Sequence, residues 1–172
     1  MITIREEIPQ DALQVRRVNE LAFERPQEAE LVDRLRARCD DLLSLVAIDE
    51  GVLVGHILFS PAIVQGPDGG GPRGMGLAPM AVAPERQRQG VGSALVERGL
   101  ALLRERGCPF VIVLGHPTYY PRFGFVPASR SGLTCQWDGI PDDVFMAQIL
   151  DVERMHGVAG VARYRDEFDD AM

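Results

Sequence analysis

A strand, a turn and a helix that opens on glycines follow one another between Met80 and Val96, in the segment MAVAPERQRQGVGSALV. Pro84 ends the strand, and apolar residues then recur at helical spacing from Gly90 onward. A strand that leads through a short turn into a helix is a building unit of α/β proteins. The segment therefore predicts an α/β fold, and the remaining chain is interpreted around it.

The start of this helix also predicts a binding site for an anion. The first N–H groups of a helix have no partner within the helix, and they lie at the positive end of its dipole. Gly90 and Gly92 let the backbone come close to a bulky ligand, and Arg86 and Arg88 add positive charge. This combination suits a pyrophosphate group.

The order of predicted elements is strand, two helices, three strands, helix, strand, short helix and strand. Strands are expected over residues 2–5, 42–48, 52–64, 76–83, 110–114 and 144–150, with 124–127 leading into the final strand region, and helices over 11–23, 28–38, 90–106 and 118–123. The strand at 144–150 is predicted to be the last, and the acidic residues from 166 are expected to fray. The glycine-rich stretch 66–74 precedes a strand and is interpreted as a plain loop. One domain, 1–172, is expected.

Composition excludes several classes of protein. The net charge of −7 disfavours nucleic-acid binding, and no apolar stretch reaches the ~20 residues that span a membrane. The N-terminus lacks the apolar region of a signal peptide, so a cytoplasmic location is expected. The chain contains no lysine, which excludes a Walker-A loop and a lysine Schiff base. The cysteines and histidines are scattered, so no metal site is predicted: Cys39, Cys108, Cys135, His56, His116 and His156.

The six residues Gln87 to Gly92 resemble the acetyl-CoA-binding motif of the GNAT superfamily of N-acetyltransferases, [QR]-x-x-G-x-[GA]. The resemblance implies that backbone amides from Arg88 to Ser93 hold the pyrophosphate of coenzyme A. It also implies that the pantetheine arm pairs with the preceding strand. The residues implied to bind acetyl-CoA are Met80, Ala81, Val82, Gln87, Arg88, Gln89, Gly90, Val91, Gly92 and Ser93.

A second segment, VIVLGHPTYYPRFGFVP over Val111 to Pro127, strengthens the resemblance. Its Tyr120-Pro-Arg-Phe-Gly-Phe125 stretch matches the family pattern Tyr-x-x-x-Gly-Phe and is similar to a bacterial subgroup of predicted N-acetyltransferases. The resemblance extends from Ile2 to Tyr164 and implies a mixed, mostly antiparallel sheet, flanked by helices and splayed at the coenzyme-binding strand. It also makes a homodimer plausible. An asparagine that many relatives carry early in this segment has no counterpart here.

The implied reaction is direct attack of a primary amine, on a small molecule or a peptide, on the acetyl thioester. The oxyanion needs a donor, for which we expect a backbone N–H near Met80 or Ala81. Tyr120 is the candidate general acid for the leaving thiolate; alternatively it packs as core against Phe123 and Phe125. Tyr119 is the neighbouring alternative acid, for which a structural role is favoured. His116 is the candidate base, with an uninvolved loop histidine and water-mediated deprotonation as the alternatives.

Two other functions stay open. A catalytically silent acyl-CoA-binding or regulatory module of the same fold is favoured by the lack of a carboxylate from Leu77 to Val82. A Rossmann-type dinucleotide site would need a glycine where Leu95 stands.

Overall fold

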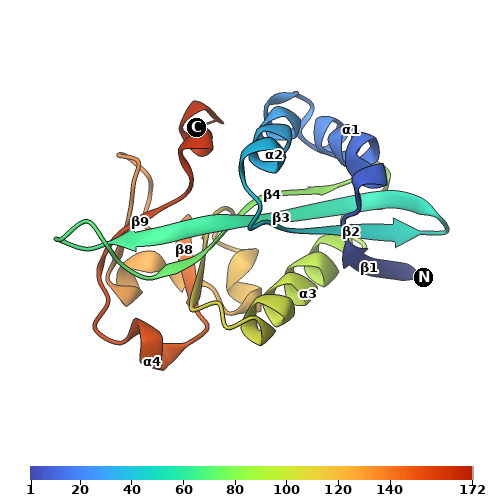
Figure 1. Cartoon of the computed structure of the whole chain (residues 1–172). Coiled ribbons are helices and arrows are strands. Elements are labelled where there is room, and N and C mark those ends of the chain that lie inside the picture. The colour runs from blue at the N-terminus through green and yellow to red at the C-terminus, as the bar shows by residue number, and fades with distance from the viewer. Residues whose placement is uncertain (172) are drawn as a thin grey trace. The chain divides into compact units, whose positions relative to one another are not determined.

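The computed structural model describes residues 1–171 (Figure 1). They form two compact units, each assembled from segments that are distant in sequence. Unit 1 contains residues 1–59, 78–101 and 166–171, and unit 2 contains residues 60–77 and 102–165. Two long strands and one helix contribute residues to both units. The single domain expected from the sequence stays a prediction.

Most predicted elements are confirmed, with boundary changes of a few residues. The strands are β1 (Ile2–Glu6), β2 (Leu43–Asp49), β3 (Val52–Gln65), β4 (Arg73–Val82), β5 (Phe110–Leu114), β6 (Val126–Pro127), β7 (Leu133–Cys135), β8 (Phe145–Ile149) and β9 (Gly160–Arg163). The α-helices are α1 (Ala12–Phe23), α2 (Gln27–Arg38), α3 (Val91–Glu105) and α4 (Val152–Met155). None of the helices in the described part of the chain is long and apolar enough to cross a membrane.

Unit 1 is built on strands in the order β1-β2-β3-β4, in which β1 pairs with β2 and β2 with β3, both antiparallel. The β2–β3 hairpin turns at Glu50 and Gly51, whose φ angles of 49° and 81° are those of a tight hairpin turn. Within this unit, α1 and α2 cover one face of the strands and α3 covers the other (Figure 1).

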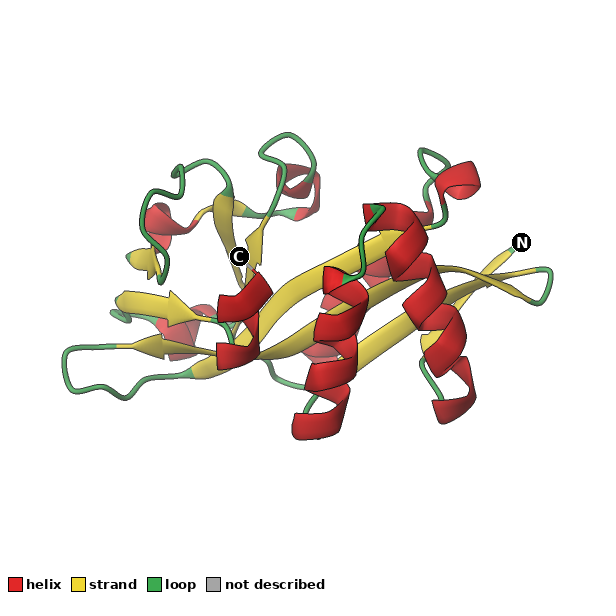
Figure 2. Ribbon diagram, turned by 90° about the horizontal axis from the view of Figure 1, so that it is seen from above, coloured by secondary structure: helices red, strands yellow, loops and turns green. Residues whose placement is uncertain are grey.

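Helices α1 and α2 lie side by side (Figure 2) and bury different kinds of residue. In α2 the buried residues form one apolar stripe: Ala29, Leu31, Val32 and Leu35. In α1, Val15 and Val18 are buried together with the polar Asn19, whereas Leu13 is 82% exposed. The face of α1 toward the strands is therefore partly polar.

Helix α3 approaches β3 closely because both elements carry a glycine at the contact. A Cβ at Gly55 would lie 2.9 Å from the side chain of Val91, and a Cβ at Gly99 would lie 2.4 Å from the ring of Phe59. Larger residues would push the helix away from the strand. These two glycines set the distance at which α3 packs.

Unit 2 contains a parallel pair, β4 and β5, with the register Met75↔Val111 to Leu77↔Val113. Strand β5 continues the sheet through antiparallel pairs with β8 and then β6, while β9 pairs antiparallel with β3 and parallel with β7. The predicted mixed, mostly antiparallel sheet with flanking helices is confirmed. The β4–β5 ladder ends at Leu77, although β4 itself continues to Val82.

Two predictions about the C-terminal third are wrong. The strand at 144–150 is not the last, because α4 and β9 follow it, and β7 precedes it. Strands of three or four residues with glycines nearby have no recognisable alternation, so they escape pattern analysis. The residues from 166 do not fray: Asp166–Ala171 form a 3₁₀ helix in which Glu167 and Phe168 are buried.

Candidate functional site

The turn that joins β4 to α3 is held open by two glutamine side chains. Gln87 Nε2 donates to the carbonyl of Val82 at 3.0 Å, and Gln89 Nε2 donates to the carbonyl of Glu85 at 2.9 Å. These bonds satisfy backbone acceptors within the turn. Within the same turn, the N–H groups of Arg86 and Gln87 donate to the carbonyls of Ala83 and Pro84.

The first turn of α3 presents backbone donors at an exposed surface. The first bond within the helix runs from the N–H of Ala94 to the carbonyl of Gly90, at 3.0 Å, so the N–H groups of Val91, Gly92 and Ser93 have no acceptor in the helix. Gly90 has a φ of 88°, which favours glycine, and a Cβ there would meet open space. A bulky anion can approach these amides.

The two arginines of the turn differ in their surroundings. Arg86 Nη1 lies 2.5 Å from Asp49 Oδ2. Hydrogen bonds from the terminal amine and, second, from Arg86 hold the pKa of that carboxyl below its usual value. The charge of Arg86 is therefore offset by a carboxylate. Arg88 is exposed and has a φ of 61°, so the backbone at the centre of the turn is left-handed.

The edge of β4 that faces away from β3 can be assigned from one hydrogen bond. The N–H of Ala83 donates to the carbonyl of Val54 in β3 at 2.9 Å. Backbone groups of successive residues in a strand point to alternate edges. The N–H of Val82 therefore faces the opposite edge. Earlier in the chain the alternation has the other phase, because the carbonyl of Pro72 accepts the N–H of Val64 in β3, so the strand is irregular between Pro72 and Ala83.

In unit 2, Tyr120 is placed by the turn after β5. Its side chain is only 8% exposed, and its ring packs edge-to-face against Phe125 at 5.7 Å and Tyr119 at 5.1 Å. A Cβ at Gly115 would lie 2.3 Å from the Tyr120 ring, so this position accepts only glycine. Burial raises the pKa of the Tyr120 phenol, and the neighbouring Tyr119 raises it further. The group is a neutral donor at physiological pH.

His116 begins the same turn, but its side chain is exposed. Its carbonyl accepts the N–H groups of Tyr119 and Tyr120 at 3.2 and 3.4 Å. The residue thus shapes the segment that carries Tyr120 through its backbone. The predicted coenzyme-binding residues all belong to unit 1, and the two predicted catalytic residues belong to unit 2.

A buried polar chain in unit 1 was missed by the sequence analysis. The Asn19 amide donates to the Val15 carbonyl at 2.9 Å and to His56 Nδ1 at 3.1 Å, so Nδ1 is the acceptor and Nε2 carries the proton. Nε2 lies 2.9 Å from Ser44 Oγ, which donates to Glu7. No motif marks these residues, because they come from separate elements.

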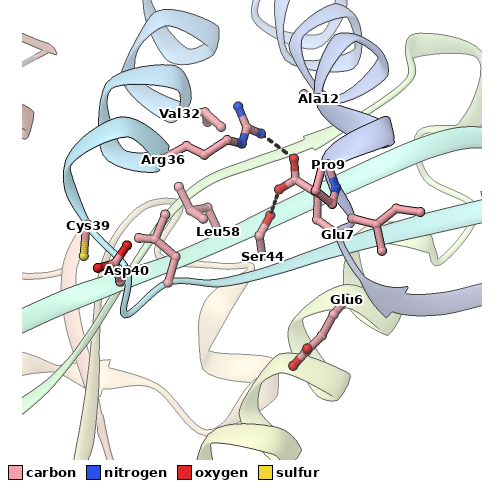
Figure 3. A pocket seen from close by; sticks show the side chains of 12 residues that line it. Glu6, Glu7, Pro9, Ala12, Val32, Arg36, Cys39, Asp40, Ser44 and Leu58 are labelled. Atoms are coloured by element: carbon pink, nitrogen blue, oxygen red, sulfur yellow. Dashed lines mark hydrogen bonds and ion pairs between the residues drawn. The ribbon is translucent and has the colours of Figure 1, made fainter.

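Ser44 and Glu7, at one end of this series of hydrogen bonds, line a pocket of about 410 Å³ between α1, α2 and the strands. Glu7 lies at its centre, bonded to Arg36 on one side and Ser44 on the other (Figure 3). The walls are closed by apolar side chains that include Val32 and Leu58. Glu7 is 9% exposed, and its charge is met by Arg36.

Comparisons with known proteins agree with the turn and the sheet described above. Residues 12–125 match the family described as Acetyltransferase (GNAT) family. The chain is 39% identical to the uncharacterized N-acetyltransferase YhbS of Escherichia coli K12 over 167 residues, which cover 96% of this chain and 98% of YhbS.

Solved structures of similar proteins carry coenzyme. The crystal structure of E. coli YhbS in complex with CoA has a TM-score of 0.89 and 37% identity, covering 98% of this chain and 92% of YhbS. A GNAT family acetyltransferase from Brucella melitensis in complex with acetyl-CoA has a TM-score of 0.78 and 35% identity, covering 98% and 99%. With the β4–turn–α3 segment and the mixed sheet in place, these matches establish that the chain belongs to the GNAT family of N-acetyltransferases.

Proposed function

We propose that this enzyme transfers the acetyl group of acetyl-CoA to a primary amine, on a small molecule or a peptide, by direct attack. The observation that carries the proposal is the exposed start of α3, where three backbone N–H groups lack acceptors in the helix and Gly90 leaves open space. The structures of YhbS in complex with CoA and of the Brucella protein in complex with acetyl-CoA support a coenzyme site in this chain.

The pyrophosphate of acetyl-CoA would lie on the amides from Arg88 to Ser93. The helix dipole and the oriented N–H groups favour its negative charge, and the exposed Arg88 adds a cation beside it. Gln87 and Gln89 support this site by bonding the carbonyls of the turn, which keeps acceptor oxygens away from the phosphates.

The pantetheine arm would pair with the edge of β4 that faces away from β3. The residues predicted to contact it are Met80, Ala81 and Val82, although the Val82 carbonyl is already bonded to Gln87. The backbone N–H of Met80 or Ala81 would donate to the thioester oxygen when it becomes an oxyanion.

Tyr120 would protonate the thiolate that leaves when the amine attacks. Burial keeps the phenol neutral, so it can donate a proton without first having to bind one. Its packing against Phe125 and Gly115 holds the ring in one orientation. His116 stays a candidate for the base, with deprotonation through water as the alternative, because its side chain faces solvent.

A silent acyl-CoA-binding module differs from this enzyme in one measurable respect. Both bind acetyl-CoA, but only the enzyme releases free thiol when an amine is added. The cytoplasmic location and a homodimer stay predictions.

The coenzyme site is tested by thermal unfolding with acetyl-CoA, CoA and NADH on wild type and on Ser93→Glu. A carboxylate in the first turn of α3 is favourable for the helix but repels a pyrophosphate, so the variant should fold and lose binding. A ligand at 100 times its Kd adds about 2.7 kcal/mol of stability, or about 5–10 °C for a chain of this size.

The matched control is Arg98→Gln, which makes the same change in net charge on the exposed side of α3, away from its first turn. It should keep the full shift with acetyl-CoA. If wild type shows no shift with either form of coenzyme A, or if Ser93→Glu keeps the wild-type shift, the proposed site is wrong.

A further inference from the structure

Tyr164 follows β9 directly, and the fold holds it tightly in unit 2. The side chain is 4% exposed, and its ring stacks on Trp137 with centroids 5.8 Å apart and an interplanar angle of 26°. Its backbone N–H donates to Gln136 Oε1 at 2.6 Å. A Cβ at Gly76 would lie 2.4 Å from the Tyr164 ring, so strand β4 has a glycine where the ring passes.

The hydroxyl of Tyr164 reaches the end of the β4–β5 ladder. It lies 3.1 Å from the carbonyl oxygen of Leu77 in β4 and 3.3 Å from that of Ile112 in β5. The backbone N–H of Leu114 bonds to the same phenol oxygen. The hydroxyl therefore meets backbone groups of both strands.

Two of these groups, the Leu77 carbonyl and the Leu114 N–H, belong to the last rung of the ladder. In a parallel pair, a carbonyl bonds the N–H of the residue after its register partner. Val113 is the partner of Leu77, so the last rung joins the Leu77 carbonyl to the Leu114 N–H. The next rung would need an N–H at position 79, and proline has none. Tyr164 thus bonds both ends of the rung after which the ladder cannot continue.

We propose that Tyr164 is a positioning residue, whose hydroxyl clamps the last β4–β5 rung and thereby fixes the point at which β4 leaves β5. The inference rests on the proposed function, because β4 continues from this point into Met80, Ala81 and Val82, the residues assigned to the pantetheine arm. Without the Tyr164 hydroxyl, the hydrogen bond between Leu77 and Leu114 would open more often, and β4 and β5 would separate at this end of the ladder. A clamped rung keeps the start of the coenzyme-binding stretch in one place.

The clamp itself is tested without any coenzyme, by amide hydrogen exchange in Tyr164→Phe. This variant keeps the ring that packs on Gly76 and Trp137 and removes only the hydroxyl. Exchange of the Leu114 amide should become about tenfold faster, which corresponds to the loss of one buried hydrogen bond. The amide of Gly115, which bonds the Val144 carbonyl at 2.9 Å, is the internal reference and should exchange at its wild-type rate.

The effect on the coenzyme is tested by comparing acetyl-CoA with 3′-phosphorylated ADP, which keeps the pyrophosphate but lacks the pantetheine arm. In Tyr164→Phe we expect the Kd for acetyl-CoA to rise about tenfold and the Kd for the nucleotide to stay unchanged. General loss of structure would weaken both ligands alike. Tyr119→Phe, whose ring is half-exposed, is the matched control and should change neither constant.

Each outcome decides the inference. Unchanged exchange at Leu114 overturns the clamp, and faster exchange with equal effects on both ligands overturns its role in positioning the coenzyme. If wild type binds neither ligand, the proposed function fails, while the exchange measurement still decides whether Tyr164 clamps the rung.

Discussion

At the scale of single residues, His56 has the most demanding environment. Its side chain is fully buried on β3, between Asn19 of α1 and Ser44 of β2, and burial together with the charge of Arg36 lowers its pKa from 6.5 to about 3. The imidazole is therefore neutral in the folded protein at any pH near neutrality. Its two hydrogen bonds require one tautomer, with the proton on Nε2.

This depressed pKa predicts that stability falls as the pH drops below about 6.5. The unfolded chain then binds a proton at His56 while the folded chain does not, so the unfolding free energy decreases by about 1.4 kcal/mol per pH unit. The contribution is fully present above the unfolded pKa. Urea unfolding at pH 7.5, 6.5, 5.5 and 5.0 measures it.

His56→Gln should be less stable at pH 7.5 and lose less stability between pH 6.5 and 5.0 than wild type does. His156→Gln, in an exposed position, should follow the wild-type curve. All measurements are made at pH 5 or above so that carboxyl groups do not contribute to the change in stability. The hydrogen bonds from Arg5 hold the pKa of Asp11 low, so protonation of Asp11 destabilises the protein only in stronger acid. Parallel curves for wild type and His56→Gln would refute the assignment.

Tyr120 gives a second prediction at this scale. If it donates a proton to the leaving thiolate, Tyr120→Phe should lower kcat by about 100-fold and leave the Kd for acetyl-CoA near its wild-type value, because the ring packing is kept. Thiol release with an accepted amine measures kcat, and calorimetric titration measures Kd. An unchanged kcat would mean that Tyr120 serves only as core, and Tyr119→Phe is the control.

At the scale of elements, the contact of α3 with β3 depends on the absence of side chains. Gly99 lies inside α3, where alanine would ordinarily favour the helix by about 1 kcal/mol. Here its Cβ would overlap the Phe59 ring, which lies under the helix on β3. Close packing therefore decides which residue this helix carries, against its intrinsic propensity.

We predict that Gly99→Ala destabilises the protein by about 1–3 kcal/mol, the ordinary cost of overpacking. Phe59→Leu should make the same substitution less harmful, because the smaller side chain leaves room for the methyl group. A double-mutant cycle in urea measures this coupling. Stabilisation by Gly99→Ala would show that the helix shifts without cost.

At the scale of the whole molecule, chain segments far apart in sequence complete each unit. Residues 166–171 belong to unit 1 with the first 59 residues, and their 3₁₀ helix packs against α2. Phe168 is 3% exposed, and Arg34 donates to the carbonyl of Glu167 at 3.4 Å. Phe168 is therefore part of the core of unit 1.

Phe168→Ala should cost about 3–5 kcal/mol of unfolding free energy, as expected for a large buried aromatic side chain. Val152→Ala, at a position that is 73% exposed, should stay within about 0.5 kcal/mol of wild type. Chemical unfolding of both variants compares them directly. Equal stabilities would mean that the end of the chain is dispensable.

The sequence by itself determined the elements whose information is local. The coenzyme turn, the helices α1, α2 and α3 and the long strand β3 depend on periodicity and on residues close to each other in the chain. The family followed from two such segments. The short strands β7 and β9 were missed because three or four residues do not establish a period.

Only the tertiary structure decided which side chains meet. His56 bonds Asn19 across 37 positions, and the Tyr164 hydroxyl reaches Leu77 across 87. A lone buried histidine or tyrosine has no sequence pattern, since its partner is determined by how strands and helices pack and not by its neighbours in the chain. Contacts of this kind exist only after the strands and helices have packed, so they are seen in the structure and not in any local sequence pattern.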